Sequence, residues 1–290
     1  MRLGLHAIGI GAGARRATIE VVARTAETCG FTTLWAGEHV VMVDQPQSRY
    51  PYSRDGQIAV PATADWLDPF VALSFAAAAT QRIRVATGVL LLAEHNPVIV
   101  AKQAASLDAL SDGRLTLGVG VGWSREEFDA LGVPFAGRGA RIDEYLQAMR
   151  VLWREDVASF AGEFVAFSGV RLNPKPVHGR RVPIVIGGNS DAALRRVARL
   201  GDGWYGFNLV GLDAVRERLV RLRELCEQAS REFGELDIAV ALQDPRPGDL
   251  AALAHLGVRE LVVAQAPPED PRSVEAWVAA LARRWDLATA

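Results

Sequence analysis

Short apolar runs alternate with longer amphipathic segments along the chain, and eight of these runs have the length and composition of strands. They cover residues 2–8, 32–36, 83–92, 114–122, 182–187, 203–208, 237–242 and 260–265. The segments between them place apolar residues three and four positions apart, which is the spacing of one helix face. The first such face contains Ile19, Val22, Ala23, Ala26 and Cys29. The pattern therefore predicts a series of strand–helix units.

Two of the predicted helices carry a clear start signal. Asp68-Pro69 and Asn96-Pro97 each place a capping side chain directly before a proline. Proline suits the first helical position because its φ angle is already helical and its missing N–H has no partner there. We therefore expect helices to begin at these two prolines.

A parallel sheet closed into a (β/α)8 TIM barrel accounts best for this alternation in a chain of 290 residues. We interpret residues 1–290 as a single domain of this kind. An open doubly wound sheet fits less well, because the first strand-to-helix turn, in IGIGAGARRAT, lacks the G-x-G-x-x-G signature of dinucleotide binding. Glu38 comes closest to a ribose-binding acid after the second strand, but it does not have the usual placement.

Two insertions interrupt the alternation after the second and fourth strands. Residues 40–67 are rich in polar residues, proline and tyrosine. Residues 123–181 contain a helical pattern over 140–155 and a hairpin-like pattern over 157–172. Barrel enzymes keep their active sites at the carboxyl ends of the strands, so we expect a lid or a substrate wall from these segments. The alternative is a surface ornament or a subunit contact.

The fourth strand, RLTLGVGVG, has one face with almost no side chains. The positions that alternate with leucine and valine, and therefore face the barrel interior, are Thr116, Gly118, Gly120 and Gly122. Bare glycines let another group approach the backbone closely, so this face is a candidate cofactor floor; the alternative is that large neighbours fill it. No G-K-[ST] follows, which argues against a phosphate loop.

Composition narrows the function classes. The chain has 32 basic and 34 acidic residues and a net charge of -2, so nothing favours nucleic acid or an anionic membrane as a partner. The apolar runs are shorter than a membrane span. Cys29 and Cys226 each lie on an apolar helical stripe and are expected to be core thiols in a reducing compartment. The N-terminal apolar stretch reads better as a first strand than as a signal peptide, so we predict a cytoplasmic protein.

Longer motifs carry a family resemblance. The stretch from IRVATGV to GRGARIDE (83–144), together with LWAGEH, DWLDPFVALSFAAAAT, PIVIGGNSDAALRR and GDGWYGF, resembles the luciferase-like monooxygenase family. More narrowly, these motifs resemble its branch of deazaflavin (coenzyme F420)-dependent oxidoreductases. The resemblance covers most of residues 2–210, and the remainder matches only in pattern. These motifs are specific for the superfamily, less so for the cofactor and not at all for the substrate.

The resemblance implies a cofactor, FMN or F420, at the carboxyl ends of the strands. In this family a bulge with a non-prolyl cis peptide supports the cofactor ring from one face. The matching position here is the bond between Gly88 and Val89, with Thr87 beside it. Gly120 would then contribute to the bare floor under the ring.

The resemblance also implies a site for the phosphate tail after the fifth strand of the barrel. A helix N-terminus with exposed N–H groups binds anions, and two glycines precede this one. The implied tail-binding residues are Gly187, Gly188, Asn189 and Ser190, one of the last two being the helix cap. Gly122 and Trp123 would lie nearby. Arg138 and Arg141 would either add positive charge or pair with Asp143 or Glu144.

His39, at the end of the second strand, is the candidate catalytic residue. Histidine exchanges a proton near neutral pH, and related deazaflavin enzymes place a histidine here beside the reacting carbon. Glu38 would orient His39 or contact the cofactor, although relatives often have aspartate at this position. His95 follows the third strand and is expected to point over the pocket. No metal site is predicted, because His6 has no partner at metal-ligand spacing, which disfavours a metal-dependent barrel hydrolase.

These observations lead to one functional prediction and two alternatives. We expect hydride transfer between F420 and a small organic substrate, with His39 handling a proton. The first alternative is FMN-dependent monooxygenation, with reduced flavin supplied by a separate reductase. The second is a non-catalytic flavin-binding protein, which would tolerate loss of His39. Trp35, Trp66 and Tyr50 or Tyr52 are candidates for an apolar substrate pocket, and relatives are usually homodimers.

Overall fold

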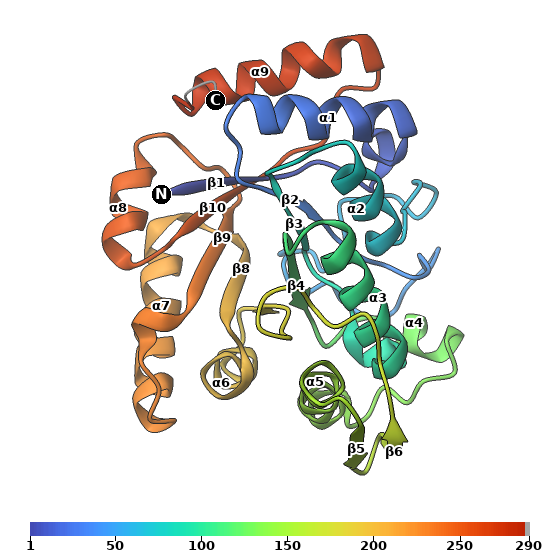
Figure 1. Ribbon diagram of the computed structural model, residues 1–290. Helices are drawn as coiled ribbons and strands as arrows, with labels where there is room; N and C mark the ends of the chain where they lie inside the picture. The colour runs from blue at the N-terminus through green and yellow to red at the C-terminus, as the bar shows by residue number, and fades with distance from the viewer. Residues whose placement is uncertain (288–290) are drawn as a thin grey trace.

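The computed structural model describes residues 1–287 and contains a closed barrel of eight parallel strands (Figure 1). Around the barrel the order is β1, β10, β9, β8, β7, β4, β3 and β2, and β2 pairs with β1 to close it. The strands are Arg2–His6 (β1), Thr33–Ala36 (β2), Arg84–Thr87 (β3), Leu115–Val119 (β4), Ile184–Gly187 (β7), Gly203–Leu209 (β8), Asp237–Leu242 (β9) and Glu260–Ala264 (β10). The TIM-barrel prediction is confirmed, and the open doubly wound sheet is wrong.

Helices form the layer outside the barrel. They are Arg16–Thr28 (α1), Pro69–Ala78 (α2), Pro97–Leu110 (α3), Arg138–Arg154 (α5), Asp191–Leu200 (α6), Gly211–Gln228 (α7), Asp249–Leu256 (α8) and Val274–Arg284 (α9). Short 3-10 turns lie at Gly11–Ala14, Leu92–Glu94, Phe233–Glu235 and Pro271–Ser273. Helices α2 and α3 begin at the predicted prolines. The side chains of Asp68 and Asn96 accept hydrogen bonds from the N–H groups of Val71 (2.9 Å) and Val98 (2.9 Å).

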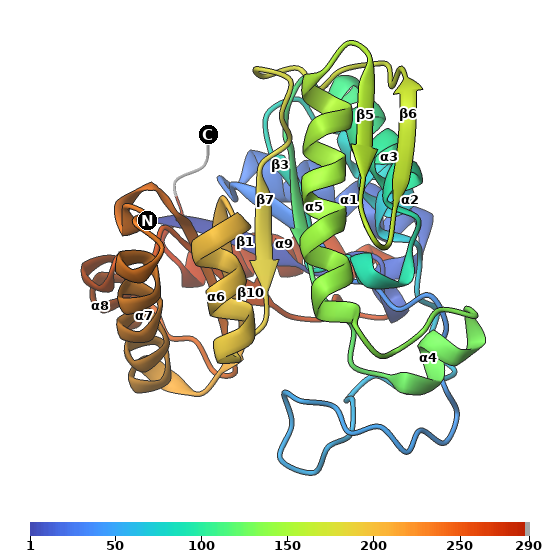
Figure 2. The same cartoon turned by 90° about the horizontal axis from the view of Figure 1, so that it is seen from below.

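The two insertions take different paths. Residues 40–67 form a loop that lies at the same end of the molecule as α4 (Arg125–Ala130), the end toward which β7 points (Figure 2). Glu126 joins the two, because its Oε1 accepts the N–H groups of Gln47 (2.6 Å) and Ser48 (3.0 Å). The predicted hairpin is confirmed as β5 (Ala158–Ala161) and β6 (Ala166–Val170), which pack beside α5.

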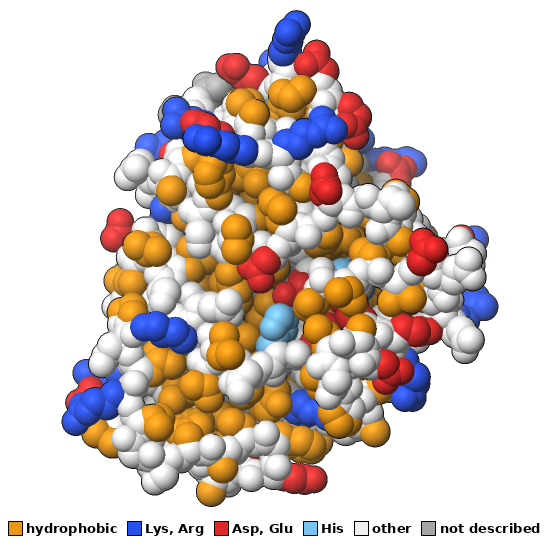
Figure 3. Space-filling model, turned by 90° about the vertical axis from the view of Figure 1, so that its right-hand side faces the viewer, with side chains coloured by type: hydrophobic (Ala, Val, Ile, Leu, Met, Phe, Trp, Pro, Cys, Tyr) orange, Lys and Arg blue, Asp and Glu red, His pale blue; other side chains and the backbone are white. Residues whose placement is uncertain are grey.

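Helices α2 and α3 pack side by side and expose apolar side chains. Val71 is 64% exposed and Ile99 is 60% exposed, and Phe75 and Leu110 are also exposed on these helices. Figure 3 faces this side of the molecule and shows hydrophobic side chains spread across it. None of the helices described is long and apolar enough to cross a membrane.

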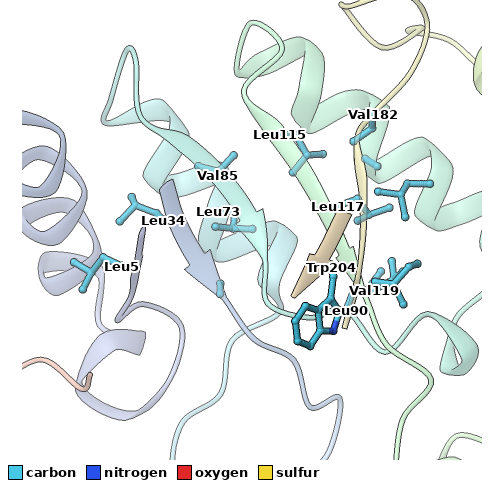
Figure 4. Close-up of a cluster of buried hydrophobic side chains, with 14 of the residues drawn as sticks. Leu5, Leu34, Leu73, Val85, Leu90, Leu115, Leu117, Val119, Val182 and Trp204 are labelled. Atoms are coloured by element: carbon cyan, nitrogen blue, oxygen red, sulfur yellow. The ribbon is translucent and has the colours of Figure 1, made fainter. Parts of the chain in front are cut away.

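Side chains of the strands point alternately into two apolar layers. The larger layer lies between strands and helices and contains Leu5, Leu34, Val85, Leu115 and Leu117 (Figure 4). The smaller layer fills the barrel and contains Trp35, Ala86, Val185, Tyr205, Ala239, Ala241 and Val262. Both predicted core thiols, Cys29 and Cys226, are buried in the outer layer. The inner layer forms the base on which the cavity described below rests.

Candidate active site

A cavity of about 280 Å³ opens at the carboxyl ends of the strands. Its walls come from the ends of β1, β2, β3, β7 and β8, and from the 40–67 loop. The loop contributes Tyr50, Tyr52, Ile58, Ala59, Val60 and Trp66, so this insertion is a wall of the cavity. From the second insertion, only Trp123 lines it. A larger, open groove of about 950 Å³ lies between the carboxyl-terminal ends of α6 and α7, away from this cavity.

His39 lies in the cavity wall and is fixed by a buried carboxylate. Its Nδ1 is 2.8 Å from Oε2 of Glu127, which lies on α4. The rings of Trp66 and Trp123 meet the His39 ring nearly at right angles, at centroid distances of 4.9 and 5.7 Å. Because Nδ1 is held by a carboxylate, Nε2 is the ring nitrogen left for a bound molecule.

Glu127 is itself held from two directions. Its Oε1 accepts hydrogen bonds from the N–H groups of Val40 (2.7 Å) and Val41 (3.3 Å), directly after His39. Its own N–H donates to Oγ of Ser124, the N-cap of α4 (3.4 Å). Glu127 was not among the site residues predicted from the sequence. The spacing of Ser124 and Glu127 is that of a capping box, so this glutamate has a local explanation that conceals its contact with His39.

Glu38 does not orient His39. Its Oε2 accepts the N–H of Leu91 (2.6 Å), and its Oε1 lies 3.0 Å from Nε2 of His95. Burial alone would lower the pKa of His95, but its hydrogen bond to Glu38 and the negative charge of Glu38 outweigh burial and raise it. His95 is therefore turned toward Glu38 and does not line the cavity, contrary to expectation, whereas Glu38 does line it.

Glu94 is a buried acid that the sequence analysis also missed. It is 6% exposed, and neither of its carboxyl oxygens has a hydrogen-bond partner among the described residues. Burial, with the nearby charges of Glu127 and Glu38, raises its pKa to about 9. Glu94 is therefore protonated and uncharged at neutral pH. Together, Glu38, Glu94 and Glu127 form a carboxyl cluster beneath the two histidines.

The glycine face of β4 is filled by Val89 and is not an open floor. A Cβ at Gly120 would lie 2.9 Å from Val89 Cγ2, and a Cβ at Gly187 would lie 2.8 Å from Val89 Cγ1. A Cβ at Gly118 would meet the carbonyl oxygen of Thr87 at 2.0 Å. The alternative of large neighbours is thus confirmed. The glycines admit Val89, and Val89 in turn forms part of the cavity wall.

Of the three residues predicted at the bulge, two line the cavity and one lies behind its wall. The peptide bond between Gly88 and Val89 is cis, as the resemblance implied, and both residues line the cavity. Thr87 lies behind them, fully buried, and donates to the carbonyl of Gly118 (2.7 Å). Gly120 does not reach the cavity either.

Gly122 and the two arginines after it also lie outside the cavity. At Gly122 φ is +75°, and a Cβ would meet Glu94 Oε1 at 2.6 Å, so only glycine fits this turn.

The guanidinium of Arg138 lies over the Phe135 ring at 3.8 Å and donates to the Gly122 carbonyl at 3.2 Å. Arg141 is buried on α5. Neither arginine forms an ion pair with Asp143 or Glu144: Asp143 pairs with Arg196, and Glu144 accepts backbone N–H groups of the β5–β6 turn.

Only two of the four residues predicted to bind the phosphate tail line the cavity. Gly187 and Gly188 line the cavity, while Asn189 and Ser190 do not. Ser190 is the cap of α6, since its Oγ accepts the N–H of Ala193 (3.2 Å), whereas the side-chain amide of Asn189 donates to the carbonyl of Phe207 (2.8 Å). Asn189 lines an adjoining open depression of about 770 Å³. Tyr52 and Asn208 line both this depression and the cavity.

Two polar side chains at the cavity lack any described partner. The hydroxyl of Tyr205 on β8 and both ring nitrogens of His6 on β1 are buried without a hydrogen bond. Burial lowers the pKa of His6 to about 4, so its imidazole is neutral. Sequence reasoning singled out neither residue for the site. Nothing in their spacing along the chain distinguishes them from ordinary strand residues. The described residues contain no group of three or more His, Cys, Asp and Glu side chains placed to hold a metal.

Comparisons with known proteins agree with this architecture. The chain is 36% identical to an uncharacterized protein of Mycobacterium tuberculosis over 271 residues, 93% of this chain and 94% of the other. It is 29% identical to the FMNH(2)-dependent dimethylsulfone monooxygenase of Pseudomonas putida over 197 residues, which span 66% of this chain and 52% of that protein.

Solved structures share the fold at low sequence identity. The monooxygenase RslO1 from Streptomyces bottropensis superposes with a TM-score of 0.75 at 20% identity, covering 99% of this chain and 97% of that one. The coenzyme F420-dependent tetrahydromethanopterin reductase from Methanopyrus kandleri gives 0.73 at 16% identity, covering 98% and 97%. The model of the family described as luciferase-like monooxygenase matches residues 3–244. The chain therefore belongs to the luciferase-like monooxygenase family.

Proposed function

We propose that this protein is an oxidoreductase that transfers a hydride between F420 and a small organic substrate in the cavity at the strand ends. The observation that carries the proposal is the position of His39. It lies in the wall of a largely aromatic cavity and is fixed by Glu127, with Gly88, Val89, Gly187 and Gly188 also in the wall. An acid–base group beside bare backbone suits proton transfer to a flat, bound ring.

The residues present fit a deazaflavin or flavin. Gly37, Gly88, Gly187 and Gly188 present backbone to the cavity, and aromatic side chains supply apolar walls of the kind that planar rings pack against. Arg54 and Asn189 line the adjoining depression near the start of α6. The guanidinium of Arg54 can receive an anionic tail, and the unpartnered amide oxygen of Asn189 can accept a hydrogen bond from a tail hydroxyl. When bound, the ring supplies the hydride chemistry, and the protein supplies position and electrostatics.

His39 and Glu127 would act as one unit. Glu127 holds the ring nitrogen Nδ1, which fixes the tautomer and directs Nε2 to the proton being moved. Its negative charge would stabilise His39 when the imidazole takes up a proton. The carboxylate is also held by two backbone N–H groups, so the pair is positioned before a substrate binds.

FMN-dependent monooxygenation is the second candidate. It is favoured by the name of the Pseudomonas putida relative, an FMNH(2)-dependent monooxygenase, although this chain spans about half of that protein. The F420 proposal draws on the reductase from Methanopyrus kandleri, which shares the fold over 97% of its length at 16% identity. Under the FMN candidate a separate reductase would supply the reduced flavin.

The experiment that tests the proposal is a titration of the purified protein with F420 and, separately, with FMN, followed by tryptophan fluorescence. Trp66 and Trp123 line the cavity and report binding there. Micromolar F420 binding with little FMN binding is the expected result. FMN binding alone would favour the monooxygenase, and binding of neither would overturn both candidates.

We also propose that the protein is a homodimer formed through α2 and α3. The support is the exposed apolar surface on these helices, which includes Val71, Phe75, Ile99 and Leu110. Exposed apolar side chains grouped on one face are typical of protein–protein contacts.

A further inference from the structure

The inner end of the cavity carries two polar groups that the proposed chemistry does not use. Tyr205 is 1% exposed, and its hydroxyl has no hydrogen-bond partner among residues 1–287. Both ring nitrogens of His6 are likewise buried and unpartnered, and both residues line the cavity. A buried polar group without a partner costs free energy, so such groups are retained where a ligand satisfies them.

These two side chains belong to one aromatic floor. The Tyr205 ring stacks on Trp35 at 4.6 Å, and Phe207 lies between the two polar residues, 5.9 Å from Tyr205 and 6.4 Å from His6 by ring centroids. On the other side, a Cβ at Gly88 would lie 3.6 Å from the His6 ring and 3.0 Å from the Trp35 ring. The floor is therefore closely packed, and it carries two buried polar side chains that have no hydrogen-bond partner among the described residues.

The floor lies on a different arc of the barrel from the residues assigned to the cofactor. The assigned residues follow β2, β3, β4 and β7, which are consecutive around the barrel. His6 comes from β1 and Tyr205 from β8, on either side of β9 and β10. Neither His6 nor Tyr205 belongs to the residues assigned to the cofactor, although the His6 ring lies beside Gly37 and Gly88. A group bound between them is therefore assigned to the substrate, and the cofactor titrations described below test this assignment.

The charges around the cavity define the kind of group that fits. Among the described lining residues there is no lysine or arginine to receive an anion, and His39 is already paired with the carboxylate of Glu127. Glu38, the one carboxylate among those same residues, is already held by Leu91 and His95, so it is not free for a cation. His6 is neutral, and burial raises the pKa of Tyr205 well above its ordinary value, so the hydroxyl keeps its proton. A charged ligand group would lose its hydration here without compensation.

We infer that the substrate is an uncharged, largely apolar molecule whose single polar head, a carbonyl, amide or hydroxyl, is bound by Tyr205 and His6. The tyrosine hydroxyl donates to an oxygen, and the neutral imidazole can both donate and accept. This inference rests on the proposed function for the identity of the reaction, but the binding it describes is measurable without turnover.

The test uses three aromatic probes of similar size. Benzamide is uncharged, benzoate is an anion and benzylamine is a cation. Their binding to the full chain is measured by calorimetry, with and without F420 or FMN. We expect benzamide to bind at least about tenfold more tightly than either charged probe, because burying an unpaired charge costs more than one hydrogen bond returns. Tighter binding of benzoate or benzylamine, or no benzamide binding, would overturn the inference.

Substitutions at Tyr205 and His6 test which polar atoms bind benzamide. Tyr205→Phe keeps the ring on Trp35 and should weaken benzamide binding about three- to tenfold, as expected for one uncharged hydrogen bond. Its melting temperature should not fall, because the variant removes an unsatisfied hydroxyl. His6→Phe is the second variant, with the same expected weakening, and far-UV circular dichroism checks its fold. Tyr145→Phe, on α5 away from the cavity, is the matched control and should bind benzamide like wild type.

The cofactor titrations separate this inference from the proposed function. Unchanged F420 or FMN affinity in Tyr205→Phe supports a substrate site, whereas a loss of cofactor affinity would mean that the floor binds the cofactor and would overturn the inference. If the wild-type protein binds neither cofactor, the proposed function fails, and the benzamide series still decides the nature of the floor.

Discussion

The imidazole of His39 and the carboxylate of Glu127 are joined by a 2.8 Å contact across 88 positions of sequence. His39 lies three residues after the end of β2, and Glu127 lies in the first turn of α4, so the contact forms only when these two segments meet over the barrel. The same carboxylate also holds the backbone of Val40 and Val41. The pair therefore links a candidate proton-transfer group to the start of the loop that walls the cavity.

Replacement of His39 by alanine separates catalysis from binding. We expect His39→Ala to lower the turnover of reduced cofactor by about 10²- to 10⁴-fold, the usual contribution of an acid–base group. Cofactor affinity, measured by fluorescence titration, should stay within a few-fold. His255→Ala, an exposed histidine on α8, is the control. Wild-type turnover in His39→Ala would remove the catalytic role and favour a non-catalytic binding protein.

Replacement of Glu127 by glutamine keeps the shape of the side chain and removes its charge. The amide oxygen of the variant would still accept the Val40 N–H, but the side chain could no longer stabilise a protonated His39. We expect kcat to fall about ten- to hundredfold with little change in cofactor affinity, as for other residues that orient a catalytic histidine. Asp129→Asn, an exposed acid on the same helix, is the matched control. Equal kcat values for Glu127→Gln and this control would show that the contact is only structural.

The buried acid Glu94 should give the protein a pH-dependent stability. Its pKa of about 9 in the folded state exceeds its ordinary value of 4.5, so the folded protein retains a proton that the unfolded chain releases. Stability must then fall as the pH rises between these values, by up to about 1.4 kcal/mol per pH unit for one proton. Glu94→Gln should flatten this decline in denaturation curves recorded from pH 6 to 9. Parallel curves for variant and wild type would contradict the proposed protonation.

The packing of Val89 against Gly187 predicts a compensating pair of substitutions. Gly187→Ala places a Cβ 2.8 Å from Val89 Cγ1, so we expect a loss of about 1–3 kcal/mol of unfolding free energy and weaker cofactor binding. In a Val89→Ala background the same change should cost less, because the space is free. Gly248→Ala, where nothing lies within 4 Å, controls for the loss of glycine. Additive effects of the two substitutions in urea denaturation would argue against this contact.

The apolar faces of α2 and α3 predict the oligomeric state. Light scattering after gel filtration should give a mass twice that of the 31.3 kDa chain. The double variant Val71→Glu, Ile99→Glu should shift this mass to the monomer, because it buries charges in the contact. Val220→Glu, a half-exposed valine on α7, is the control. A monomeric wild-type protein would refute the dimer.

Local patterns in the sequence were enough to predict the barrel. The eight apolar runs, the capped prolines at Pro69 and Pro97, and the motif around Gly88 and Val89 are local signals. Each depends on the backbone preferences of a few adjacent residues, and each is found in the structure, although the strands predicted over 83–92 and 114–122 end at Thr87 and Val119. The same local pattern predicts that His39 lies at the carboxyl ends of the strands, because His39 closely follows the second strand in the sequence.

Which of these residues meet in the cavity depends on the folded barrel as a whole. The alternating glycines of β4 suggested an empty face in the barrel. They give no information about Val89, whose side chain fills that face from the end of the neighbouring strand, β3. Glu127, Glu94 and Tyr205 come from segments far from His39 in sequence, and their spacing resembles ordinary caps and strand positions. The burial of these residues, their hydrogen-bond partners or lack of them, and the raised pKa values of Glu94 and Tyr205 arise only when the barrel closes and excludes water. These properties depend on residues that are neighbours only in the folded protein, so the periodicity of the sequence cannot predict them.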